Sequence, residues 1–161
     1  MVKDIVTILG VIGGFTYYVM TVRASQRNQK HQIETRQAQF LLDLNRMWTK
    51  EKARDWSKLK HLPFEDTQGF FEIYDAPENS EIQLQFSTVF DMMHTYGQIL
   101  KNGLFDPVWM YDAMVGWSVI GLWNKYDPII KELRKRWNAP LAYEYFEYLA
   151  EEMEKVERIK L

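Results

Sequence analysis

Residues 5–22 read IVTILGVIGGFTYYVMTV, eighteen positions without a charged side chain, and Arg23 ends the run. At about 1.5 Å of rise per residue, a helix of this length covers about 27 Å, close to the hydrocarbon thickness of a bilayer. The stretch therefore predicts a single-pass transmembrane helix, with membrane lipid as a partner. The rest of the chain is charged, aromatic-rich and helix-patterned, which predicts an all-α protein whose anchor continues into a compact bundle.

Two other interpretations of this stretch stay open. A cleaved signal peptide fits the tripeptide Val22-Arg23-Ala24, although Lys3 stands beside Asp4 and the apolar run is long for a leader. A buried core helix is the second alternative. Such a helix normally carries polar residues along one side, whereas threonines are the only residues that interrupt this apolar run, and their hydroxyls can bond to backbone carbonyls.

Basic residues set the predicted orientation of the anchor. Lys3 alone precedes the run, whereas Arg23, Arg27, Lys30 and Arg36 follow it. Because Lys and Arg concentrate on the cytoplasmic side of spanning helices, we expect the N-terminus outside and the body in the cytoplasm. The same basic segment also allows a role at a lipid surface.

Gly10 and Gly14 form a GxxxG pattern inside the apolar run. Small residues at this spacing let two helix backbones approach closely in lipid, so the pair is a candidate dimer contact. The alternative is that the two glycines have no role in dimerisation, because glycine is common in membrane-spanning helices in general.

Composition excludes several classes of function. The formal net charge is −2 with opposite charges interleaved, so we expect no nucleic-acid partner. The chain has no cysteine, which excludes disulfides, thiolate zinc sites and a cysteine nucleophile. Serine hydrolase, zincin, dinucleotide and P-loop motifs are missing, so we expect no cofactor and the sequence implies no catalysis.

Periodicity predicts three parts: 1–23 an anchor, 24–36 a basic polar stalk, and 37–161 a cytoplasmic bundle of about five to six helices. Thr49 is expected to restart a helix after a bend, and residues 61–79 to hold a short packed helix between Pro63 and Pro77.

Capping signals predict the later helices. Ser80-x-x-Gln83 matches a capping box, and Asn102-Gly103 ends that helix. Asp106-Pro107 begins a segment, Val108 to Trp123, that is apolar nearly all round and reads as the central core helix or, less well, as a second span. Asp127-Pro128 predicts a kink or restart, and the last helix is expected from 138–140.

Several residues along the chain carry a resemblance to a known family: the basic segment 23–36, the turn Gly103-Leu104-Phe105-Asp106, Tyr111, Trp123, Arg134 and Glu147-Tyr148-Leu149. With these residues in this order, the chain resembles an uncharacterised prokaryotic family. That family is a domain of unknown function with one spanning helix before a compact helical body. The resemblance implies a fold and carries no activity.

One group of His, Asp and Glu residues gives a weak signal for a metal site between helices. Asp91 and His94 lie one helical turn apart, and Glu144 and Glu147 offer two more carboxylates on the last helix, whose acidic face also carries Glu151 and Glu154. The favoured interpretation of His94 is a polar residue at the edge of the core. Arg134 and Glu147 come from consecutive helices and are a candidate structural ion pair.

These observations lead to one functional hypothesis and one alternative. The chain is expected to be a membrane-anchored interaction module, binding another protein as an accessory subunit of a membrane complex or pairing as a homo-oligomer. The alternative is a small membrane-bound enzyme or metal-binding bundle that uses Asp91, His94 and the last-helix glutamates.

Overall fold

The computed structural model describes the backbone of residues 2–161, and the side chains of 14–161 apart from 44, 45 and 47. The chain divides after Met47 into two units, 1–47 and 48–161. Within the described residues, all regular structure is helical, so the predicted all-α class is confirmed.

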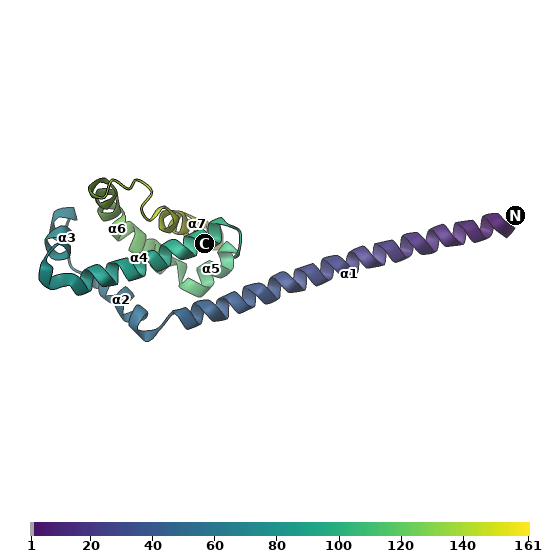
Figure 1. The fold of residues 1–161 in the computed structure, drawn as a ribbon, viewed down its shortest axis with the longest axis horizontal. Coiled ribbons are helices and arrows are strands. Elements are labelled where there is room, and N and C mark those ends of the chain that lie inside the picture. Colours follow the sequence, from purple (N-terminus) through teal and green to yellow (C-terminus); the bar gives the residue numbers. More distant parts are fainter. Residues whose placement is uncertain (1) are drawn as a thin grey trace. The chain divides into compact units, whose positions relative to one another are not determined.

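The first unit is a single helix, α1 (Val2–Met47), drawn in purple to blue in Figure 1. Its 46 residues measure about 69 Å along the helix axis. No proline occurs before Pro63, and Thr21 and Thr35 donate their hydroxyls to carbonyls of the preceding turn instead of disrupting it. The predicted boundaries at 23 and 36 both lie inside this uninterrupted helix.

The structure corrects the predicted transmembrane anchor. Within the part of the chain that the structure describes, no helix is long and apolar enough to cross a membrane. Residues 5–13 of the predicted span lie outside the described side chains. On this finding the predicted single-pass anchor is wrong, and the orientation across a membrane that was predicted from it is not supported.

The compact unit holds the remaining helices (Figure 1). They are α2 (Lys50–His61), α3 (Thr67–Tyr74), the 3₁₀ turn η1 (Pro77–Asn79), α4 (Ser80–Lys101), α5 (Pro107–Met114), α6 (Gly116–Arg136) and α7 (Glu144–Lys160). The long helices α4 and α6 both pack against α7, and the α4–α7 contact is the larger of the two. Thr49 caps α2 by accepting from the Lys52 amide at 3.3 Å, as the sequence predicts.

An aromatic cluster around Tyr126 forms the core of this unit. The Tyr126 ring lies 5.7 Å from those of Phe70 and Phe86 and 5.2 Å from that of Phe90, between ring centroids. All four side chains are fully buried. Because these rings come from α3, α4 and α6, the predicted short helix between Pro63 and Pro77 is a core element and not a surface loop.

Lys125 and Tyr126 fasten the C-terminal end of α2 to α6. The Lys125 ammonium donates to the carbonyls of Leu59, Lys60 and Leu62 at 3.2, 2.9 and 2.8 Å, and the Tyr126 hydroxyl donates to Leu59 at 2.8 Å. Burial lowers the pKa of Lys125 and raises that of Tyr126. The carbonyls that the end of a helix leaves unpaired are thereby satisfied. The sequence carries no local signal for this contact.

Three predicted helix boundaries need correction. Asn79, not Ser80, is the N-cap of α4, and Gln83 donates to the Tyr74 carbonyl at 2.6 Å, so no capping box forms. Pro128 lies inside an unbroken α6. The last helix begins at Glu144, because residues 139–143 form turns.

The segment read as one central core helix is in fact two. Val115 adopts a left-handed conformation with φ of 54°, which ends α5 and begins α6. The break turns Trp109 and Trp117 outward, with 42% and 55% of each side chain exposed, while Trp123 stays buried. A second membrane span across this segment is thereby excluded as well.

Candidate interaction surface

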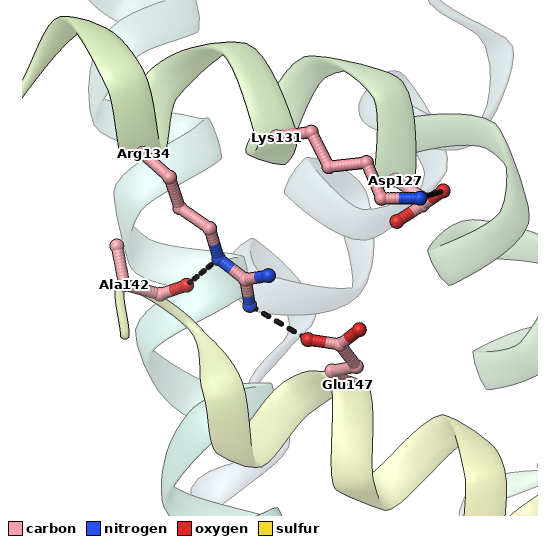
Figure 2. A network of polar contacts seen from close by, with 5 residues as sticks. All are labelled: Asp127, Lys131, Arg134, Ala142 and Glu147. Carbon is pink, nitrogen blue, oxygen red and sulfur yellow. Dashed lines mark hydrogen bonds and ion pairs between the residues drawn. The ribbon is translucent and has the colours of Figure 1, made fainter. Parts of the chain in front are cut away.

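The structure brings the predicted pair Arg134 and Glu147 together. Figure 2 shows Arg134 reaching from α6 to two acceptors: its Nε donates to the Ala142 carbonyl at 2.9 Å, and its Nη2 donates to Glu147 Oε2 at 2.8 Å. Only 17% of the Arg134 side chain is exposed. A guanidinium can hold both acceptors because its donors are fixed in one plane, so this residue ties the 137–143 connection to α7.

The predicted metal residues are not assembled into a site. No group of three His, Asp or Glu side chains that could hold a metal ion occurs among the described residues. The His94 ring faces that of Tyr145 at 4.9 Å, and its buried Nδ1 has no hydrogen-bond partner. Asp91 is exposed, and Glu147 is held by Arg134. Burial raises the pKa of the adjacent Tyr143 phenol, as does the nearby Asp91 carboxylate.

The predicted dimer contact lies partly outside the described residues. Gly10 is among those whose side-chain surroundings are not described. Gly14 has open space where a Cβ would stand, with no atom within 4 Å.

The feature that the sequence did not predict is a concentration of exposed apolar side chains on α5 and its flanks. We call these the α5 surface: Leu104 (66% exposed), Val108 (41%), Trp109 (42%), Val115 (49%) and Trp117 (55%). Single exposed apolar residues are ordinary, but five within fourteen positions, two of them tryptophans, are not. A helix that is apolar nearly all round offers no pattern from which the outward side could be chosen.

Local contacts fix α5 in this orientation. The Asp106 carboxylate caps the helix by accepting from the amides of Val108 and Trp109 at 2.8 and 3.2 Å, as the sequence predicts. At the other end, a Cβ on Gly116 would meet the Tyr111 ring at 2.1 Å, so α5 folds back closely on the start of α6. Met110 is fully buried beneath. The outward side of α5 is thus held by its capped and packed inward side.

Charged groups contact one residue of the α5 surface and α5 itself. The Lys60 ammonium lies 4.6 Å from the centre of the Trp117 ring. Lys160, from α7, pairs with Asp112 and lies 5.0 Å from the Tyr111 ring centre. An apolar centre with a charged rim is the usual composition of a protein-binding surface.

A comparison with protein families identifies the chain at the level of family. A domain of unknown function, DUF4760, matches residues 5–153. The chain belongs to the DUF4760 family. The DUF4760 match extends through α1 and into α7, so it includes the whole α5 surface. The resemblance to an uncharacterised domain of unknown function is therefore confirmed at that level, and DUF4760 as described assigns no activity or site. No curated protein and no solved structure matches the chain.

Proposed function

We propose that this DUF4760 protein is an interaction module and that its compact unit binds a protein partner through the α5 surface. The observation that carries the proposal is the exposure of two tryptophans, Trp109 and Trp117, within fourteen residues that also expose three aliphatic side chains. Tryptophan is the residue most enriched at the energetic centres of interfaces, because it offers a large rigid area at low entropic cost.

Backbone strain at Val115 supports the same surface. A β-branched residue in the left-handed region is a genuine outlier and costs roughly 1–3 kcal/mol, whereas glycine would adopt it freely. The strained residue carries a side chain that is half exposed and belongs to the α5 surface. A strained conformation at an exposed position is expected where a partner uses the side chain.

The chemistry of the partner follows from the surface. An apolar patch bordered by Lys60 and by the Lys160–Asp112 pair suits a protein surface of matching shape, either another protein or a second copy of this chain. The compact unit holds fourteen Lys and Arg against nineteen Asp and Glu, a formal charge of −5 that opposes a phosphate backbone. The absence of a nucleic-acid partner and a prokaryotic origin remain predictions.

Photocrosslinking in the native cell tests the proposal. A benzoylphenylalanine placed at Trp109 or Trp117 of the full chain is expected to give a discrete adduct with a partner protein or a second copy. The matched control is Trp137, which is 47% exposed in the same unit but outside the α5 surface.

The purified partner then allows an affinity measurement. Trp109→Ala is expected to weaken binding by about tenfold or more, since an interfacial tryptophan commonly contributes more than 1 kcal/mol. Trp137→Ala should leave the affinity unchanged, and urea unfolding should be alike in the two variants. Adducts at all three positions in equal yield, or none at 109 and 117, would remove the α5 surface as the binding site.

A further inference from the structure

We propose that the partner of the α5 surface is another protein, whose contacting segment combines apolar side chains with carboxylates that pair with Lys60 and Lys101. This inference rests on the proposed function, because it names the chemistry of the segment that the α5 surface binds. The two lysines come from different helices, α2 and α4, and both are exposed. Cations beside an apolar surface select a partner of the opposite charge.

Lys60 lies directly against the α5 surface. Its ammonium is 4.6 Å from the centre of the Trp117 ring, and among the described residues no carboxylate pairs with it. An ammonium has three donors, and an aromatic face engages only one side of it. The remaining donors are therefore available to a carboxylate, which would be held beside the Trp117 ring.

Lys101 has the same arrangement near the other end of the α5 surface. Its ammonium lies 4.5 Å from the centre of the Tyr148 ring of α7, and it too pairs with no carboxylate in the part of the chain that the structure describes. Lys101 ends α4, three positions before Leu104. The Leu104 amide donates to the Ile99 carbonyl at 3.1 Å, which keeps Leu104 close to the end of α4. A cation thus accompanies Leu104 as another accompanies Trp117.

Most other cations of the compact unit already have a partner. Of its fourteen Lys and Arg, eight form an ion pair with a carboxylate, and Lys125 donates to backbone carbonyls. The other five are Lys50, Lys52, Arg54, Lys60 and Lys101. Because the unit has more carboxylates than cations, a cation without an ion pair is the exception, and two of the five accompany the α5 surface.

A second copy of the α5 surface would not supply the missing carboxylates. The five residues of this surface are uncharged, and a two-fold pair of copies would bring the same lysines to both sides. The nearby Asp112 already pairs with Lys160, and Asp106 caps α5. The opposite charge is therefore expected from another protein.

Charge variants combined with photocrosslinking test this inference in the native cell. The full chain carries benzoylphenylalanine at Trp109, which leaves Trp117 in place beside Lys60. Lys60→Met keeps an unbranched side chain that can cover the ring, and should lower the adduct yield about threefold, as expected for one exposed ion pair. Lys60→Glu should lower it about tenfold, because like charges then meet. Lys60→Arg should keep the yield.

Lys50→Met is the matched control, because it removes another exposed lysine of α2 that has no ion pair. It should leave the adduct yield unchanged, and urea unfolding should be alike in all the variants. Mass spectrometry of the adduct should find Asp or Glu within a few residues of the attached site. Added salt should lower the yield more in the unaltered chain than in Lys60→Met.

The outcomes separate this inference from the proposed function. No adduct at Trp109 would remove the α5 surface as the binding site, and this inference with it. A normal adduct that Lys60→Glu leaves unchanged would keep the α5 surface but show that its partner is not acidic there. Equal losses in Lys60→Met and Lys50→Met would mean that overall charge attracts the partner. An adduct with a second copy of this chain would overturn the choice of another protein.

Discussion

The helix α1 and the compact unit are both helical, but different forces hold them. The described side chains of α1 are mostly exposed, and its ion pairs join residues three or four positions apart in one helix, such as Lys30 with Glu34. The compact unit buries an aromatic core and joins separate helices through Arg134 and Lys125. Their formal charges also have opposite signs, +3 from six Lys and Arg against three Asp and Glu in 1–47, and −5 in 48–161. The comparison teaches that α1 is a locally stabilised helix, whereas the compact unit is cooperative.

One substitution made in both regions gives the largest expected contrast. A Cβ on Gly97 in α4 would lie 1.7 Å from the Tyr145 carbonyl oxygen, so Gly97→Ala forces α4 and the start of α7 apart. We expect a loss of about 3 kcal/mol in the free energy of unfolding. Gly14→Ala meets open space in α1 and should favour the helix by about 1 kcal/mol.

Tryptophan fluorescence and far-UV circular dichroism separate these two effects. All six tryptophans lie between 48 and 137, so fluorescence in urea reports the compact unit alone, while dichroism reports both units. Gly97→Ala should lower the fluorescence midpoint and Gly14→Ala should not move it. A fluorescence midpoint that shifts equally in both variants would contradict the view that the two regions are stabilised separately.

Ion pairs provide a second, smaller contrast. Arg134→Met leaves the Ala142 carbonyl and the Glu147 carboxylate without their donor, and we expect a loss of about 2 kcal/mol from the compact unit. Lys30→Met removes an exposed pair with a separation of 4.0 Å and should change the dichroism melt by less than about 0.5 kcal/mol. Arg134→Lys is the informative control, because lysine keeps the charge but cannot reach both acceptors in one plane. Full stability in Arg134→Lys would mean that charge alone matters.

The sequence predicted those parts of the fold that depend on local chemistry. The caps at Thr49 and Asp106 form because a side-chain oxygen placed before a helix satisfies its free amides, and Gly103 takes the positive φ of 65° that ends α4. The apolar seam of α7 is buried at Phe146, Leu149, Met153 and Val156, as its period implies.

What the sequence could not predict depends on contacts between distant residues. The break at Val115 has no turn residue before it, and the Tyr111 ring packs closely on Gly116 beside it. Gln83 donates to a backbone carbonyl nine positions away, which replaces the local cap expected at Ser80. Lys125 finds carbonyls more than sixty positions away. The α5 surface was missed for the same reason, since only the break decides which tryptophans face outward.

The last prediction links the strain at Val115 to binding. Val115→Gly relieves the left-handed conformation and should raise the free energy of unfolding by about 1 kcal/mol, while it removes an exposed side chain from the α5 surface. The expected result is therefore a fluorescence midpoint at higher urea together with weaker binding of the crosslinked partner. Val108→Ala serves as the matched control, because it removes a similar exposed side chain without relieving strain, and should weaken binding with an unchanged midpoint. A Val115→Gly protein that gains stability and keeps its full affinity would show that the strained valine serves no partner, and the case for the α5 surface would then rest on its tryptophans alone.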